Sequence, residues 1–318
     1  MTDDSTGDSA GVSRRTVLSA TGGLAGAMLG EAQAATPPAP GGPLVDRAFV
    51  RIREGLVHYR HCGPAAKTKA LPLYLHHANP GSSRGMEGLM MQLARTRRTI
   101  APDTLGYGDS CAPDMEQPEI PDFADAVVRT LDALKIDKID YYGAHTGAHV
   151  GTELALRHPD RVRRIIFDGV TVRTPEIRAW LLANYAPKKV PDDQGSQLMW
   201  AWLFIRDMSQ FFPWFAHDRE HRTGNGIGSA RQLHNSAVDV LKALDTYHLV
   251  YNAVYRHDIG ARLPLLKHPV MCMAKETDPN IVELDNAASK IPGVKKARIA
   301  RDAGVGETVR LLNEFLDA

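Results

Sequence analysis

The sequence lacks the residue patterns that mark several common kinds of protein. Its three cysteines, Cys62, Cys111 and Cys272, lie far apart and form no Cys-x-x-Cys pair, so we expect neither a disulfide framework nor a thiolate zinc site. The formal net charge is only +1, and no basic run suggests a nucleic-acid partner. No apolar stretch is both long enough and poor enough in glycine for a stable membrane span.

The 318 residues, 43% of them hydrophobic, suffice for one large domain with an insertion or for two small domains. From Leu44 onward, strand and helix patterns alternate, which predicts a mostly parallel sheet covered on both faces. Residues 172–256 break the alternation, because they are helical in character and contain all four tryptophans. The expected strands are 48–53, 56–61, 71–76, 98–101, 138–142, 162–168, 269–273 and 296–300, and the expected helices are 85–95, 123–134 and 307–316.

The N-terminus resembles a twin-arginine export signal. Arg14 and Arg15 precede a weakly apolar, glycine- and alanine-rich stretch, and the small residues at 32–34 suit a cleavage site. We expect a signal peptide over residues 1–34, a linker over 35–47, a mature chain that begins at Ala35, and a periplasmic or secreted protein that uses the twin-arginine export machinery. The alternative is a disordered tail with a chance pair of arginines.

The segment Gly143-Ala144-His145-Thr146-Gly147 is the most informative part of the sequence. It follows a predicted strand and leads into a helical pattern, an order typical of the nucleophile elbow, a strained turn that presents one side chain above a parallel sheet. The flanking glycines suit a crowded turn without room for Cβ atoms. The apex is His145 instead of Ser, Cys or Asp, and no Gly-x-Ser-x-Gly occurs elsewhere.

Four segments, in this order and spacing, resemble the α/β-hydrolase superfamily, particularly the capped branch that holds epoxide hydrolases, haloalkane dehalogenases and small esterases. Residues 77–83 look like its oxyanion loop, 103–110 like the turn after its fourth strand, 153–162 like the end of its elbow helix, and Asp278 matches its acid position. The resemblance covers about residues 48–318. It implies an α/β-hydrolase fold: a mostly parallel eight-stranded sheet flanked by helices, with a core of 48–171 and 257–318 and a helical cap over 172–256.

The sequence departs from that family in its catalytic residues. The elbow has no hydroxyl, thiol or carboxylate at its apex, and the loop after the last strand, 301–307, has no histidine. The last histidine of the chain is His268. Because two of three triad members are missing, a covalent acyl- or alkyl-enzyme mechanism is not expected.

Geometry suggests a replacement for the triad. An imidazole at the elbow can reach Asp278 directly, which would fix its tautomer and leave the other ring nitrogen of His145 facing the pocket as a general base. The backbone N–H groups of Ala78 and Thr146 would form the oxyanion hole. We expect no cofactor and hydrolysis of an ester or lactone-type bond. A lyase or isomerase that uses the same base, and a non-catalytic binding protein with a decayed triad, remain alternatives.

A metal site is a further alternative. His76 and His77 end a strand next to the elbow, and Asp103 ends the neighbouring strand, so these residues could join His145 as ligands. Against this, His149 is expected to point towards the sheet as a core residue. In the 172–256 segment, His217 and His221 are a solvated pair that could supply the missing histidine.

The segment 172–256 also indicates the class of substrate. Its aromatic residues are too apolar for exposed helices, so they either pack in the core or line the pocket. We expect a small, largely apolar, oxygen-bearing substrate. The predicted substrate-binding residues are His77, Asn79, Trp200, Trp202, Tyr247 and Tyr251.

Overall fold

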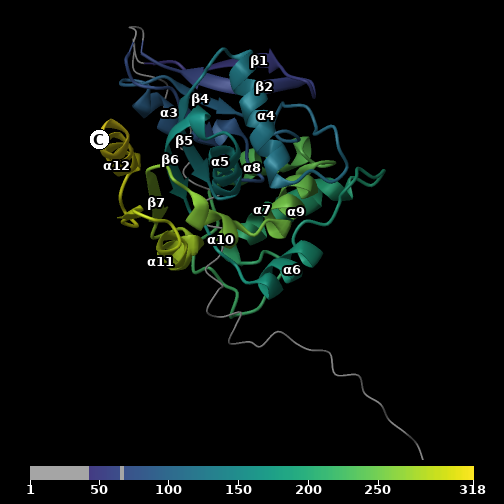
Figure 1. Cartoon of the computed structure of the whole chain (residues 1–318). Helices are drawn as coiled ribbons and strands as arrows, with labels where there is room; N and C mark the ends of the chain where they lie inside the picture. Colours follow the sequence, from purple (N-terminus) through teal and green to yellow (C-terminus); the bar gives the residue numbers. More distant parts are fainter. Residues whose placement is uncertain (1–42, 65–67) are drawn as a thin grey trace, which may run out of the picture.

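The computed structural model describes residues 43–64 and 68–318 (Figure 1). The predicted signal peptide and most of the predicted linker lie outside these residues. The strands are β1 Asp46–Arg51, β2 Leu56–Cys62, β3 Leu73–His76, β4 Thr99–Pro102, β5 Ile139–Ala144, β6 Val162–Asp168, β7 Val270–Lys275 and β8 Lys295–Ile299. The helices are α3 Glu87–Leu93, α4 Ile120–Ala133, α5 Thr146–Arg157, α6 Pro175–Asn184, α7 Ser196–Gln210, α8 Ala230–Lys242, α9 Tyr247–Arg256, α10 Ile259–Arg262, α11 Leu284–Ser289 and α12 Val305–Asp317. Short 3-10 turns are η1 Ser83–Met86, η2 Pro159–Arg161, η3 Leu263–Leu265 and η4 Pro279–Glu283.

The eight strands form one sheet in the order β1-β2-β4-β3-β5-β6-β7-β8. β2 pairs antiparallel with both β1 and β4, and the remaining neighbours are parallel. The predicted mostly parallel, eight-stranded sheet is therefore confirmed. β5 lies at its centre, so the turn after β5 stands over the middle of the sheet.

Helices cover both faces of the sheet, because the strand side chains alternate between two apolar layers. On β5, Tyr141 joins the layer that contains α4 and α5, whereas Tyr142 joins the layer that contains α3 and α12. On β7, Cys272 and Met273 alternate in the same way. Figure 1 shows α12 and α3 to one side of the sheet and α4 and α5 to the other.

The chain between β6 and β7 holds α6 to α9, which we call the insertion helices. They carry the aromatic residues noted in the sequence: Trp200 stacks on Phe204 with ring centroids 5.2 Å apart, and the Tyr247 ring lies 5.2 Å from Trp200. Their buried side chains belong to the same apolar cluster as α4, α5 and the sheet. No helix among the described residues is long and apolar enough to cross a membrane.

Two local predictions differ from the structure for identifiable reasons. The helix expected over 85–95 is the turn η1 followed by the shorter α3, because Ser82 caps η1 through its hydroxyl. The helix expected from 123 begins at Ile120, where Glu119 and Asp122 form a capping box and Pro121 occupies the first turn. The strand 162–168 has the predicted bounds.

Candidate active site

The turn between β5 and α5 places His145 over the sheet. Its backbone φ is +48° and ψ is −101°, a conformation that a residue with a Cβ rarely adopts and that costs about 1–3 kcal/mol. The backbone N–H of His145 donates to the carbonyl of Asp168 across 2.8 Å, and the N–H of Ala148 donates to the carbonyl of His145 across 2.9 Å. These bonds fix the turn between β6 and the first turn of α5.

Close packing explains the glycines around this turn. A Cβ at Gly143 would overlap the backbone of Gly147, and a Cβ at Gly151 would overlap the ring of Tyr141. The Tyr141 hydroxyl donates to the carbonyl of Gly147 across 2.8 Å. Helix α5 therefore packs directly on β5, and this close contact explains why glycines occupy these positions.

His145 lies between a carboxylate and an amide. Its Nε2 lies 3.2 Å from Oδ2 of Asp278, which is ion-pair distance, although the alignment is not that of a hydrogen bond. Its Nδ1 lies 2.7 Å from the side-chain nitrogen of Asn280. Asp278 and Asn280 are joined to each other, because the Asn280 N–H donates to Oδ1 of Asp278 across 2.8 Å. All three side chains are buried.

The contacts of Asn280 fix the orientation of its amide. Its nitrogen donates to the carbonyl of Gly169 at 3.2 Å, and its oxygen accepts from the Arg173 guanidinium at 3.4 Å. The nitrogen therefore faces His145 and donates to Nδ1, so the neutral ring carries its proton on Nε2, towards Asp278. The prediction that the second ring nitrogen faces the pocket is wrong in this structure, because Asn280 covers it.

Charges around His145 shift the pKa values of the site. Burial lowers the pKa of His145, but the carboxylates of Asp278 and Asp168 outweigh burial, so that the pKa is raised above its ordinary value. Burial also raises the pKa of Asp168 to about 6, although the Tyr142 hydroxyl donates to its Oδ2 across 2.5 Å. The imidazole is thus flanked by two carboxyl groups.

His145 and Thr146 line a pocket with about 530 Å³ of empty space, part of it open to solvent. Its walls come from the first turn of α5, the chain after β6, α6, α9, the α9–α10 connection and η4. The polar and aromatic lining includes His145, His149, Arg173, Tyr251, His257 and Asn280.

The predicted site residues lie in different places. Of the two predicted oxyanion donors, Thr146 lines the pocket, whereas Ala78 does not. Of the six predicted substrate-binding residues, only Tyr251 lines it. The other five are elsewhere: His77, Asn79, Trp200, Trp202 and Tyr247.

Packing explains these positions. The Tyr247 hydroxyl donates to the carbonyl of Pro187, and the Lys189 ammonium lies 5.4 Å from the ring centroid of Trp200. Trp202 packs against the apolar cluster. Asn79 is fully buried, and its side-chain oxygen and nitrogen have no hydrogen-bond partner within the described chain.

The two histidines proposed as metal ligands hold the loop after β3 instead. Nε2 of His77 accepts from the backbone N–H of Thr104 at 3.0 Å, and its Nδ1 donates to the carbonyl of Ala78 at 3.0 Å. Nε2 of His76 lies 3.0 Å from the Thr104 hydroxyl. Burial lowers the pKa of His76 to about 3. Three of the four ring nitrogens have protein partners, and His76, His77 and His145 do not converge as a group of possible ligands among the described residues. The geometry therefore does not suit a metal site of these three histidines.

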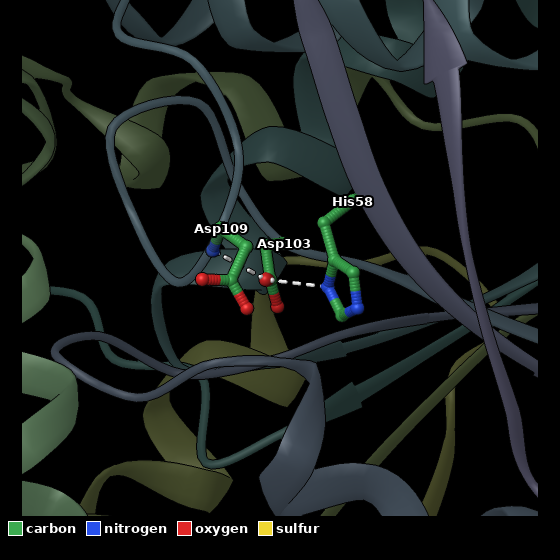
Figure 2. Close-up of side chains that lie close together, drawn as sticks. All are labelled: His58, Asp103 and Asp109. Atoms are coloured by element: carbon green, nitrogen blue, oxygen red, sulfur yellow. Dashed lines mark hydrogen bonds and ion pairs between the residues drawn. The ribbon is translucent and has the colours of Figure 1, made fainter.

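One other group of possible ligands occurs among the described residues: His58, Asp103 and Asp109 (Figure 2). Asp103 already accepts three hydrogen bonds, from Nδ1 of His58 at 2.8 Å and from the backbone N–H groups of Ser83 at 2.7 Å and Asp109 at 2.9 Å. These donors hold the pKa of Asp103 well below its usual range even though burial raises it. The Asp103 carboxylate therefore joins the surrounding loops, and its hydrogen bonds leave little capacity to bind a cation.

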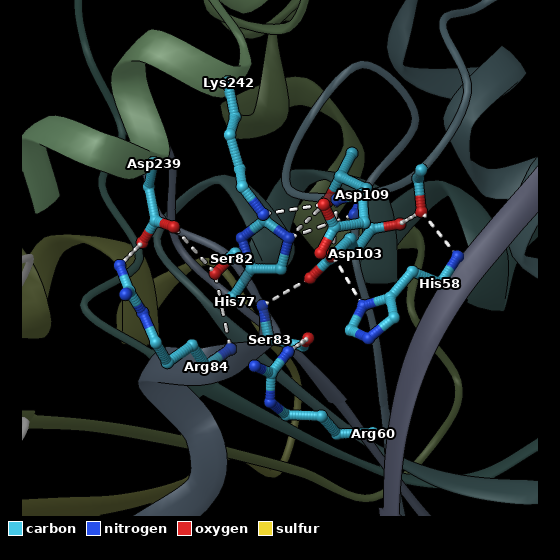
Figure 3. A network of polar contacts seen from close by, with 12 residues as sticks. His58, Arg60, His77, Ser82, Ser83, Arg84, Asp103, Asp109, Asp239 and Lys242 are labelled. Carbon is cyan, nitrogen blue, oxygen red and sulfur yellow. Dashed lines mark hydrogen bonds and ion pairs between the residues drawn. The ribbon is translucent and has the colours of Figure 1, made fainter. Parts of the chain in front are cut away.

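The same network ties the loop after β3 to an insertion helix (Figure 3). The Arg84 guanidinium lies 2.9 Å from Oδ2 of Asp239 on α8, and the Ser82 hydroxyl donates to Oδ1 of Asp239 at 3.2 Å. Lys242, also on α8, lies 2.6 Å from Oδ1 of Asp109. Helix α8 is therefore anchored to two core loops.

The other histidines named in the sequence also lie in defined places. His149 was expected in the core, but it lines the pocket, and its Nδ1 lies 3.0 Å from Nδ1 of His257. The insertion histidines do not supply a triad member, since His217 pairs with Asp207 at 3.1 Å and His221 with Asp218 at 2.8 Å, away from the pocket lining.

Several residues of the site were not among the predicted site residues. Asn280 follows the predicted acid by two residues, and Asp168 ends a predicted strand at the edge where the elbow lies, so both had a positional signal. No positional signal in the sequence pointed to His257, because the place of this residue depends on how α9 packs on α5. Gly169, with φ +72°, faces His145, and a Cβ there would lie 2.6 Å from the ring.

Comparisons with known sequences agree with this architecture. A family model described as the α/β hydrolase fold matches residues 72–211. A 2-hydroxymuconate semialdehyde hydrolase of Pseudomonas sp. (strain CF600) is 38% identical over 99 residues, 30% of this chain and 35% of that protein. A hydrolase of the same name from Pseudomonas putida is 31% identical over 149 residues, 46% of this chain and 48% of that protein. The chain thus spans less than half of the length of these curated relatives.

A solved structure extends the comparison to most of the fold. A hydrolase from Pseudomonas aeruginosa PA01 superimposes with a TM-score of 0.63 at 18% identity, covering 86% of this chain and 99% of that one. At 18% sequence identity, this similarity is evidence for a shared fold. The sheet order, the turn at His145 and the matched segment together show that the chain has the α/β-hydrolase fold.

Proposed function

We propose that the protein is a hydrolase that works in the pocket at His145. The observation that carries the proposal is the position of this imidazole: a strained turn holds it against Asp278, at the wall of a pocket and at the start of α5. The matched relatives are named as hydrolases, which supports hydrolysis as the type of reaction.

In the proposed reaction, His145 takes a proton from water on Nδ1 after the Asn280 amide has turned away. Asp278 lies beside Nε2 and stabilises the imidazolium that forms. The oxygen of the water attacks the carbonyl carbon of an ester or lactone-type bond. The N–H of Thr146, at the positive end of α5, stabilises the charge on the carbonyl oxygen.

The pocket walls support a small substrate with an apolar body and oxygen atoms. Val254 and Ile259 are apolar, and Tyr251 contributes an aromatic ring. Arg173 and Arg178 supply cationic groups. Such a mixture holds a carbon skeleton by contact and orients its oxygen atoms by hydrogen bonds.

The proposal is tested with p-nitrophenyl butyrate, ethyl butyrate and δ-valerolactone as probes. We expect measurable hydrolysis that His145→Ala abolishes and that Asp278→Asn lowers by about 10²- to 10⁴-fold. His217→Ala, a variant of an insertion histidine outside the pocket, should keep full activity. Activity should survive a chelator, since no metal is invoked. Full activity of His145→Ala would refute the proposal.

The position of Asn280 favours a second candidate, a binding protein without turnover. While its amide donates to Nδ1, neither ring nitrogen of His145 is open to a substrate. For a binding protein we expect the lactone to raise the melting temperature of wild type and of His145→Ala alike, with no hydrolysis of any probe by wild type.

A further inference from the structure

A chain of polar side chains lies behind the pocket, away from Asp278. Glu153, on α5, accepts from Nε and Nη2 of Arg262 at 2.7 and 3.0 Å and from Nε2 of His257 at 2.9 Å. Burial raises the pKa of Glu153, but these donors outweigh it and bring the pKa to about 2. Glu153 is therefore an ionised acceptor at neutral pH, and Nε2 of His257 carries a proton.

The other nitrogen of His257 leads to the pocket. Its Nδ1 lies 3.0 Å from Nδ1 of His149, so one proton lies between the two rings. Nε2 of His149 has no hydrogen-bond partner among the described residues, and His149 lines the pocket one helical turn after His145. Glu153, His257 and His149 thus form a continuous path from a buried carboxylate to the pocket.

The surroundings decide which ring holds an added proton. Burial, together with His257, Arg173 and Arg178, lowers the pKa of His149 well below its ordinary value. His257 instead touches the Glu153 carboxylate. The charged and titratable groups that line the pocket together with His149 are His145, Arg173, Arg178, Tyr251, Tyr255, His257 and Asp258. When the two rings share an added proton, His257 therefore holds it beside the carboxylate, and His149 is neutral with its proton on Nε2.

We propose that His149 is a second catalytic residue of this pocket, a general acid that donates its Nε2 proton to the leaving oxygen, with His257 and Glu153 as positioning residues. This inference rests on the proposed hydrolase function.

The steps balance without a cofactor. His145 takes one proton from the attacking water, whose oxygen bonds to the carbonyl carbon. The bond from that carbon to the leaving oxygen then breaks, and the leaving oxygen takes the Nε2 proton of His149. His149 at once receives the Nδ1 proton of His257, which ends neutral and still donates to Glu153. Solvent then supplies a proton to Nε2 of His149, whose Nδ1 proton returns to Nδ1 of His257, and His145 releases one proton to solvent.

The test compares leaving groups. A nitrophenolate leaves without help, whereas an alkoxide needs a proton, so His149→Gln should slow ethyl butyrate hydrolysis by about 100-fold or more but p-nitrophenyl butyrate by less than about tenfold. His257→Gln should show the same selective loss, and for wild type kcat on ethyl butyrate should fall at high pH in a limb that His257→Gln removes. His234→Gln, an exposed histidine on α8, should change neither rate.

Equal losses on both esters, or no loss on ethyl butyrate, would overturn the role of His149. Failure of the hydrolase proposal is distinct, because wild type would then hydrolyse neither ester or His145→Ala would keep both activities. Nitrogen-15 NMR of the histidine rings in the whole protein gives a readout independent of turnover. At the pH of maximal kcat on ethyl butyrate we expect a proton on Nε2 of His149, and an unprotonated Nε2 of His149 at that pH would also overturn the inference.

Discussion

Asn280 donates its side-chain amide to Nδ1 of His145 across 2.7 Å. The same amide is held by the carbonyl of Gly169 and by Arg173, so it cannot turn its oxygen to His145 without losing both contacts. Asp278 favours the charged imidazole, and Asn280 favours the neutral one. The protonation of His145 therefore depends on the balance between two residues that are only two positions apart in the sequence.

Removing the amide should shift that balance. In Asn280→Ala no amide donates to Nδ1, so we expect the pKa of His145 to rise further, measured by NMR titration of its ring. Asn286→Ala is the matched control, because its amide contacts Glu283 and not His145. An unchanged His145 pKa in Asn280→Ala would show that the amide does not control the ring.

Gly169 should tolerate no side chain. Its φ is +72°, and a Cβ would lie 2.6 Å from both Oδ2 of Asp278 and Cε1 of His145. Gly195 has nearly the same φ, +71°, but the nearest atom to its Cβ would be 3.5 Å away. Backbone strain alone should cost each alanine variant about 1–2 kcal/mol of unfolding free energy. We expect Gly169→Ala to lose a further 1–3 kcal/mol or so by crowding, measured by chemical denaturation, and equal losses would contradict the crowding.

Asp168 should make the protein less stable as the pH rises. Its pKa is about 6 in the folded protein against an ordinary 3.8, so the folded state binds more protons between these values. Its stabilising effect is complete below about pH 3.8 and is lost as the pH passes 6. Asp168→Asn should therefore stabilise the protein at pH 8 by up to about 3 kcal/mol, and less to the extent that the side chain is exposed.

The pH dependence provides the control for that experiment. Melting temperatures of wild type and Asp168→Asn should differ at pH 8 and converge towards pH 4. Tyr142→Phe removes the hydroxyl that donates to Asp168, so the pKa of Asp168 should rise. The loss of stability with rising pH should then occur at a higher pH than in wild type. A constant difference between wild type and Asp168→Asn at all pH values would mean that ionisation is not the cause.

The export prediction concerns residues outside the described structure. We expect the mature protein to begin at Ala35 and to reach the periplasm or medium of a host with twin-arginine export. Replacing both arginines, Arg14→Lys with Arg15→Lys, should retain the full-length chain in the cytoplasm. Mass spectrometry of the N-terminus in each cell fraction provides the measurement, and unaltered export of the double variant would refute the signal.

Local patterns were sufficient to predict the sheet and the elbow. Gly143 packs against Gly147 and Gly151 against Tyr141, so these contacts are local in the sequence. Asp278 follows its strand at a distance that the family pattern supplies. The orientation of a side chain on α5 depends instead on what packs against that helix. His149 faces His257, 108 positions later, so its place in the pocket could not be predicted from periodicity alone.

The insertion helices show the same limit for apolar residues. An aromatic run indicates burial, but it does not distinguish the wall of a pocket from the interior of a helix bundle. Trp200 and Tyr247 pack on each other, whereas Tyr251, four positions further along the same helix as Tyr247, reaches the pocket. One turn of α9 separates these two outcomes.

The apolar cluster that joins the insertion helices to the sheet has a consequence for unfolding. It runs without a break from Ile165 and Phe167 on β6 to Phe204 on α7 and Tyr251 on α9. Helix α8 is tied to the core by polar contacts as well. Because the two parts share this cluster, neither can melt while the other keeps its packing. Heat or denaturant should therefore unfold both in one cooperative transition, with the same midpoint for tryptophan fluorescence and for circular dichroism.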